Sequence, residues 1–251
     1  MISTQDYSGL PDAADLKRIS KALAVLDAIN SQDLEYRYYT YNADWGEEEQ
    51  VLEMSDGEGD QMLILFRPEG CVINGYLDGY DQPDKAQVTR GLPEVFDDFI
   101  FGEPVNSIGT TFCLWNTAGL GWQTGVLENE DDGSEELLFM LDSNPETYAE
   151  WADEYYGEET DRSPIDVAAV AKIYRGEPLT KATVLDIVDE PRRLGAGWRK
   201  TYGPLAILTI SARCQQRVQA VPLAAPNASA HVPQRSPDFR HSGDVGNSSC
   251  R

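Results

Sequence analysis

Two apolar runs joined by a tight turn restrict the fold more than any other feature of the chain. Residues Gln61–Phe66 (QMLILF) and Cys71–Leu77 (CVINGYL) flank the four residues Arg67–Gly70. Pro68 and Gly70 occupy the second and fourth positions, as a type I turn prefers. Apolar runs of this length, bounded by turn residues, are typical of strands. The stretch therefore predicts an antiparallel hairpin, and with it a sheet that the remaining elements must cover.

Four further segments have the composition of strands. The first is rich in tyrosine and the others alternate or concentrate apolar residues; they are Tyr36–Asn42, Glu49–Met54, Thr110–Trp115 and Trp122–Leu127. Residues 78–89 read as a polar loop, and Leu92–Phe101 as a short helix. Interleaved Tyr and Arg in residues 36–42 can stack on nucleic acid, but an ordinary aromatic strand is favoured in so acidic a domain.

Helical periodicity is found at both ends of this strand region. Asp12–Asn30 carries apolar residues at three- and four-residue spacing after start signals. Four helices follow the last strand; they begin near Ser134, at Pro145 with Asn144 as cap, at Ser163-Pro164 and at Thr180. Helices that are grouped rather than alternating with strands predict the α+β class. We expect an antiparallel sheet of about five to six strands with helices packed on one side.

The charge divides the chain into two parts. Met1–Glu190 holds 11 Lys or Arg against 41 Asp or Glu, whereas Pro191–Arg251 holds 9 against 2. After Leu205–Ile210 the second part has no sustained apolar period and is rich in Pro, Ser, Ala, Asn and Gln. We predict an acidic α+β domain over residues 1–190 and a basic low-complexity tail over residues 191–251, either disordered or read out of frame. A third alternative is a basic tail that folds back on the acidic face.

Most catalytic and cofactor signatures are missing from the sequence. Both histidines, His231 and His241, lie in the second part, and the four cysteines form no CxxC pair. There is no phosphate-binding glycine loop, and the acids around Gly57 and Gly59 would repel a phosphate. The loop Asp56–Asp60 could hold a divalent ion, although such spacing is common in solvated turns. We predict no catalytic residue, no metal and no cofactor.

The termini and the charge also bear on location and partners. The first residues lack the basic and apolar regions of a secretory signal, and no apolar run reaches the roughly 18 residues of a membrane span. Cys71 and Cys113 lie in apolar runs where buried reduced thiols are expected. A soluble cytoplasmic protein of a bacterial kind fits best. Nucleic acid and anionic membranes are disfavoured as partners because a net charge of −23 would repel them.

One long stretch carries a single sign of charge. Between Arg90 and Arg162 there is no Lys or Arg, while Asp and Glu number 18. On the helix after Pro145, like charges one turn apart each cost roughly 0.2–0.5 kcal/mol. A solvated face could explain them, but such a face normally mixes signs. The functional interpretation is a surface for a cationic partner, with these partner-binding residues: Glu135, Glu136, Glu146, Glu150, Asp153, Glu154 and Glu158.

Three segments carry a resemblance to other sequences. TTFCLW at 110–115, GSEELL at 133–138 and PETYAEWADEYY at 145–156 resemble an uncharacterised family of small acidic bacterial proteins. The resemblance covers roughly Gly9 to Glu190 and implies no activity and no catalytic residues. In charge and size the chain is similar to immunity proteins, which neutralise a basic toxin by covering its active site; this is an analogy only.

The leading hypothesis is a non-enzymatic acidic protein-binding module, an immunity-like inhibitor of a basic protein. Two alternatives remain. One is a carboxylate-dependent, glycosidase-like enzyme with two convergent acids near Trp115 or Trp122. The other is a structural domain with no dedicated ligand. No particular oligomeric state is predicted.

Overall fold

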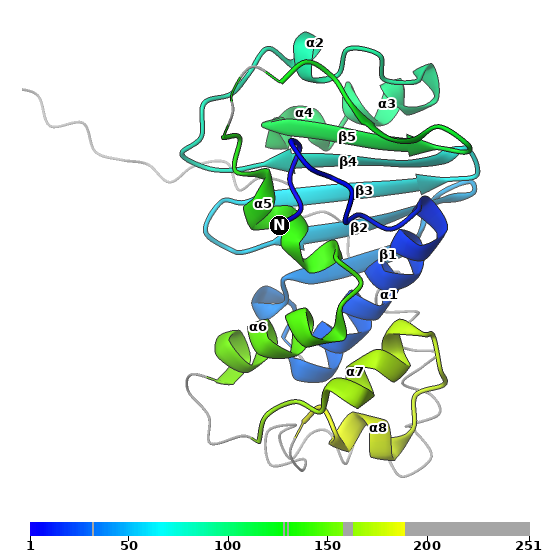
Figure 1. Ribbon diagram of the computed structural model, residues 1–251, viewed down its shortest axis with the longest axis vertical. Helices are drawn as coiled ribbons and strands as arrows, with labels where there is room; N and C mark the ends of the chain where they lie inside the picture. Colours follow the sequence, from blue (N-terminus) through cyan, green and yellow to red (C-terminus); the bar gives the residue numbers. More distant parts are fainter. Residues whose placement is uncertain (32, 128, 130, 158–162, 189–251) are drawn as a thin grey trace, which may run out of the picture. The chain divides into compact units, whose positions relative to one another are not determined.

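The computed structural model describes residues 1–31, 33–127, 129, 131–157 and 163–188, and these form an α+β fold (Figure 1). Its centre is a six-stranded sheet in which each strand pairs antiparallel with its neighbour in sequence, in the order β1-β2-β3-β4-β5-β6. The strands are β1 Tyr39–Gly46, β2 Glu49–Ser55, β3 Gln61–Arg67, β4 Gly70–Tyr76, β5 Phe112–Thr117 and β6 Gly121–Thr124. The predicted class and sheet are confirmed. The predicted tail, residues 191–251, lies outside the described residues.

The predicted central hairpin is present, with its turn between Arg67 and Gly70. Arg67 pairs with Gly70 and Gln61 with Tyr76, so β3 and β4 are in register along their whole length. The first strand, β1, begins later than predicted, at Tyr39 rather than Tyr36. Leu34–Tyr36 instead forms a turn of 3-10 helix, η1. Strand pairing starts at Tyr39, opposite Met54.

The longer helices cover one face of the sheet. They are α1 Ala13–Asn30, α6 Pro145–Gly157 and α7 Val167–Tyr174, with the shorter α5 Ser134–Leu138, η3 Phe139–Leu141 and α8 Lys181–Leu185 between and after them. Figure 1 shows α5 and α1 in front of the strands, and α6 below β1 in that view. Met62, Ile64 and Phe66 of β3 point into this layer, which holds the larger core. The predicted helix starts at Asp12 and Thr180 are confirmed, since both side chains cap backbone N–H groups.

The opposite face is closed by short helical segments. Leu63, Leu65 and Val72 pack there against Phe96 and Ile100. The predicted helix over 92–101 is divided into η2 Glu94–Phe96 and α3 Asp97–Ile100, and α4 Val105–Ile108 follows. Residues 78–89 are not all loop, because Asp84 caps the short helix α2 Lys85–Val88. Both faces of the central strands are therefore buried, which explains their continuous apolar runs.

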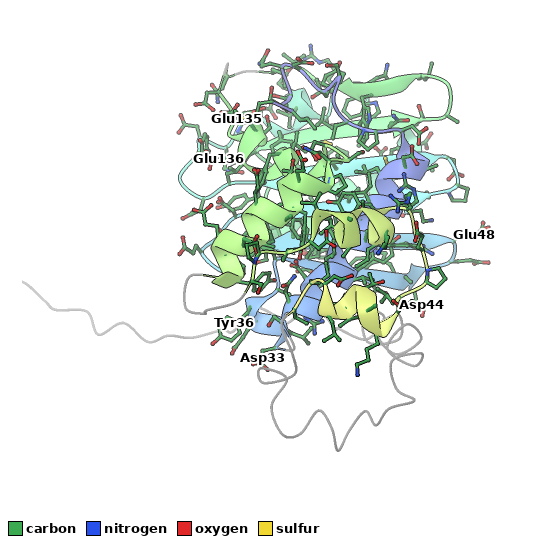
Figure 2. The ribbon with its side chains drawn as sticks, turned by 60° about the horizontal axis from the view of Figure 1, so that its bottom comes forward. Asp33, Tyr36, Asp44, Glu48, Glu135 and Glu136 are labelled. Carbon is green, nitrogen blue, oxygen red and sulfur yellow. The ribbon has the colours of Figure 1, made fainter. Side chains whose placement is uncertain are left out.

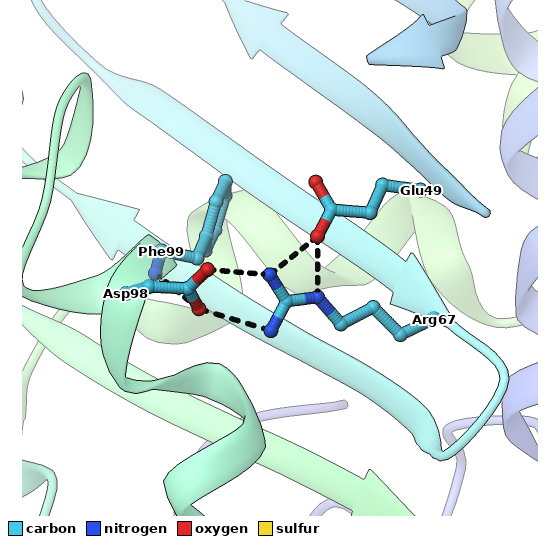
Figure 3. Close-up of polar contacts among 4 residues, drawn as sticks. All are labelled: Glu49, Arg67, Asp98 and Phe99. Carbon is cyan, nitrogen blue, oxygen red and sulfur yellow. Dashed lines mark hydrogen bonds and ion pairs between the residues drawn. The ribbon is translucent and has the colours of Figure 1, made fainter. Parts of the chain in front are cut away.

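Arg67 fastens the second layer to the sheet (Figure 3). Its Nε donates to Glu49 Oε1 at 2.7 Å, and its two Nη atoms pair with both oxygens of Asp98 at 2.9 and 2.8 Å. The arginine side chain is only 12% exposed. The hydrogen bonds from Arg67 are the main cause that lowers the pKa of Asp98. This cation therefore serves the fold.

One glycine and two cysteines lie at tightly packed positions of the sheet. A Cβ on Gly75 would lie 2.2 Å from two ring atoms of Phe112, the residue opposite it on β5. Cys71 and Cys113 are buried free thiols, as predicted, and burial raises the pKa of each to about 12. No helix among the described residues has the length and apolar character needed to cross a membrane.

Candidate partner-binding surface

A buried carboxylate joins α1, β1 and α6. Asp27 of α1 is fully buried; its Oδ2 accepts the Tyr39 N–H and its Oδ1 accepts the Tyr148 hydroxyl, each at 2.8 Å. Desolvation raises its pKa from 3.8 to about 7, against the opposing effect of these bonds and of a hydrogen bond from Tyr156. Since Tyr148 and Tyr156 both belong to α6, Asp27 fixes that helix against the start of β1.

Aromatic rings gather above this carboxylate. The rings of Trp151 and Tyr155, one helical turn apart on α6, are stacked at 5.3 Å with 9° between their planes. Tyr38, just before β1, makes edge contacts with both, at 4.9 Å to Trp151 and 4.7 Å to Tyr155. Tyr156 adds a further edge contact of 4.7 Å to Tyr155. These rings pack α6 onto the connection between α1 and β1.

This aromatic group extends to the protein surface. Tyr155 is 37% exposed, and Tyr36 and Leu34 of η1 are 55% and 50% exposed. The Tyr36 carbonyl accepts the hydroxyls of Tyr155 and Tyr156 at 3.4 and 3.3 Å, so η1 and the end of α6 are adjacent. We call Tyr36, Tyr38, Trp151 and Tyr155 the aromatic patch. Trp151 and Tyr155 are one turn apart on α6, and Tyr155 remains exposed.

Helix α6 carries three of the predicted partner-binding acids on its surface. Glu146, Glu150 and Glu154 are exposed and one turn apart. Glu154 is a neighbour of Trp151 on the helix surface, since it follows three residues later. The predicted cap is present, since Asn144 Oδ1 accepts the Glu146 N–H at 3.1 Å. Glu154 therefore borders the aromatic patch, and Glu150 and Glu146 continue the row of acids along α6.

Two other predicted residues on or after α6 have different situations. Asp153 is half-buried, and both of its carboxylate oxygens accept the Ile165 N–H at 3.1 Å. This bond ties α6 to the segment that leads into α7. Glu158 lies outside the described residues.

The remaining two predicted acids are on α5. Glu135 and Glu136 are exposed, and Figure 2 shows them well separated from Tyr36. Glu136 Oε1 accepts the Tyr80 hydroxyl at 2.6 Å, and this bond is the main cause that raises the Tyr80 pKa to about 12. The α5 acids are thus not in direct contact with those of α6.

The loop between β2 and β3 lies between these two acidic groups. Asp56 Oδ1 accepts the N–H groups of Glu58, Gly59 and Asp60 at 2.8–3.0 Å, which folds the loop tightly. Partial burial is the main cause that raises the Asp60 pKa, and the hydrogen bond from the Asp78 N–H opposes it. The charges of Asp56, Glu136 and Asp78 raise the pKa further. The sequence indicated only a weak possibility of metal binding in this loop and argued against phosphate binding.

The same loop also reaches the aromatic patch. Burial raises the Tyr38 pKa to about 12, and the next cause is the charge of Asp56, followed by those of Tyr155, Glu58 and Asp60. We call Asp56, Glu58, Asp60, Asp78 and Glu136 the acidic edge. It runs from α5 to the aromatic patch. The chain separation between residue 60 and residue 136 concealed this arrangement from the sequence.

Few cations compensate this surface. Between described residues, ion pairs join Arg18 to Asp15, Arg67 to Glu49 and Asp98, and Arg175 to Glu177. None of these pairs includes an acid of the edge or Glu146, Glu150 or Glu154. Burial is the main cause that raises the Tyr156 pKa, and the charge of Arg37 opposes this rise; the Arg37 Nε donates to the Ser31 carbonyl at 2.8 Å.

The tryptophans considered for sugar stacking are occupied otherwise. Trp115 is 2% exposed in the smaller core, and its Nε1 donates to Gln123 Oε1 at 3.2 Å. Trp122 packs against the larger core on the opposite face, and its Nε1 donates to the Pro11 carbonyl at 2.7 Å. Among described residues, no three His, Cys, Asp or Glu side chains are grouped as metal ligands. This geometry does not favour the glycosidase-like alternative.

Comparison with known proteins adds no relative: no protein-family model, curated protein or solved structure matches the chain. The resemblance suggested by the three sequence segments therefore has no further support.

Proposed function

We propose that the chain is a non-enzymatic binding protein for a basic protein, and that the acidic edge and α6 carry the contact surface. The proposal includes an immunity-like inhibitory role and a cytoplasmic location, as expected from the sequence. The observation that supports it most is that acids of the β2–β3 loop lie beside the aromatic patch, which α6 and η1 form, and continue toward Glu136 of α5.

Electrostatics gives this arrangement a physical reason. After the larger effect of burial, the charges of Asp56 and Glu136 raise the pKa of Asp60, because like charges repel one another in the free protein. A cationic partner would relieve this repulsion and would be steered toward the surface, with association that slows as salt increases. The same field disfavours nucleic acid as a partner.

The aromatic patch distinguishes this surface from one that only maintains solubility. Interfaces between proteins typically have an aromatic centre and a polar rim. Here exposed Tyr36 and Tyr155 lie beside Glu154 and the acidic edge. A surface serving solubility alone would gain nothing from leaving these rings accessible.

The test compares two triple variants with the same change of charge. Glu146→Gln, Glu150→Gln and Glu154→Gln neutralise α6; Asp44→Asn, Glu47→Gln and Glu48→Gln neutralise exposed acids at the β1–β2 turn. Figure 2 shows Asp44 and Glu48 on the opposite side of the view from Glu135, Glu136 and Tyr36. Each full-length chain is immobilised and exposed to lysate of the source organism at low and at high salt.

The proposal predicts a retained basic protein that is lost at high salt and lost with the α6 variant, while the β1–β2 variant still retains it. Retention of nothing specific at low salt would refute the proposal. Equal loss with both triple variants would also refute it, because the effect would then follow net charge rather than a surface.

A further inference from the structure

The aromatic patch allows the chemistry of the partner to be stated more narrowly, on the basis of the proposed function. Tyr155 has one ring face stacked on Trp151, yet 37% of the residue remains exposed. Tyr36 and Tyr38 are its neighbours, because the Tyr155 hydroxyl donates to the Tyr36 carbonyl and the Tyr155 ring makes an edge contact with Tyr38. The result is an open aromatic surface rather than a closed core.

Negative charge surrounds this surface. The charges of Asp27 and Asp56 both raise the Tyr155 pKa, after the larger effect of burial. Asp56, Glu58 and Asp60 act on Tyr38 in the same direction, and Glu154 precedes Tyr155 on α6. An electron-rich ring bordered by carboxylates attracts a cation both through its face and through its rim.

We propose that Tyr36, Tyr38 and Tyr155 bind an arginine side chain of the basic partner, with the guanidinium stacked on Tyr155 and directed toward the acidic edge. Arginine fits better than lysine because its guanidinium is planar, stacks on aromatic faces and donates to carboxylates as a fork. Lysine presents a compact, strongly hydrated ammonium, which can pair with the carboxylates but does not stack on the rings as a planar group does. Arginine and tyrosine are also the residue types that most often dominate binding energy at interfaces.

The test uses two peptides of equal charge, nona-arginine and nona-lysine, titrated into the full-length chain by calorimetry at low salt. The wild-type protein is expected to bind nona-arginine about five-fold more tightly, the order expected for an exposed cation–π contact with one ring or two. The variants Tyr155→Leu and Tyr36→Leu, made separately, should each bring the ratio of the two affinities toward one, because each lowers the affinity for nona-arginine only. The matched control is Phe101→Leu, which removes an aromatic ring that is 48% exposed and lies just after α3, in the layer on the other face of the sheet.

The outcomes separate this inference from the proposed function. Equal binding of both peptides to the wild-type protein would overturn the arginine assignment and leave the acidic binding function standing. Absence of binding by either peptide would overturn both. If the two tyrosine variants lower the affinity for both peptides equally, the arginine assignment would be overturned and the patch would have only a structural role. If the protein dimerises without any peptide, and Tyr155→Leu abolishes the dimer, the patch would instead bind a second copy of the chain.

Discussion

Asp27 should give the protein an unusual dependence of stability on pH. Its pKa is raised from 3.8 to about 7 in the folded state, because the carboxyl group is fully desolvated. Between these two values the folded state holds a proton that the unfolded state releases. The stability that this group contributes is therefore fully present below pH 3.8 and is lost as the pH rises through about 7. The loss is about 1.4 kcal/mol per pH unit, or about 4 kcal/mol over the whole interval.

The variant Asp27→Asn isolates this effect. Asparagine has nearly the same shape, can accept the Tyr39 N–H through its oxygen and can donate to the Tyr148 oxygen, but it does not titrate. All other carboxylates are common to both proteins and cancel in the difference. From pH 5 to pH 8 the free energy of unfolding of the wild-type protein should fall by about 3 kcal/mol more than that of the variant.

Urea denaturation at pH 5, 6, 7 and 8 and constant ionic strength, followed by tryptophan fluorescence, measures both curves. Asp44→Asn, at an exposed position, serves as a control whose curve should run parallel to that of the wild-type protein. If the Asp27→Asn curve also runs parallel, Asp27 does not change its charge in this range, and the argument from desolvation is refuted.

Two further predictions concern packing and ion pairing. Gly75→Ala should destabilise the protein by about 1–3 kcal/mol, because the new methyl group overlaps the Phe112 ring. Adding Phe112→Leu to this variant should recover part of the loss. Thermal denaturation measures both variants, and full stability of Gly75→Ala would contradict the close contact. Arg67→Lys should lower the free energy of unfolding by about 1 kcal/mol, because lysine cannot replace the forked contact with Asp98 and the Nε bond to Glu49. A double-mutant cycle with Asp98→Asn should show coupling between the two positions. Strictly additive effects would argue against the pairing.

Local signals in the sequence were sufficient for most of the fold. The turn residues Pro68 and Gly70 and the apolar runs on either side identified the central hairpin, because backbone preferences act over four residues. Asp12 and Thr180 likewise identified two helix starts through their capping side chains. The helix expected over residues 92–101 was only partly correct, since packing of Phe96 and Ile100 against the sheet imposed two shorter turns.

The candidate surface was predictable only in part. Charge counting identified the acids of α5 and α6, because charge is written directly in the sequence. It could not show that Asp153 bonds to Ile165, nor that residues 56–60 lie between α5 and the aromatic patch. Tyr36 and Tyr38 had been assigned to a single strand. Those relations depend on tertiary contacts, between residues that are 12 positions apart for Asp153 and Ile165 and more than 70 apart for Asp60 and Glu136, and no local periodicity reports them.

The order of the strands has a consequence for how the chain can assemble. Because each strand pairs with its predecessor, the sheet contains mainly short loop closures, with the connection between β4 and β5 as the longest. A ribosome releasing the chain from its N-terminus would therefore find a partner for every new strand already present. Asp27 must wait much longer, since Tyr148 emerges 121 residues after it. The carboxylate would then remain hydrated while the sheet forms, and its burial would belong to the last stage of folding, when α6 docks.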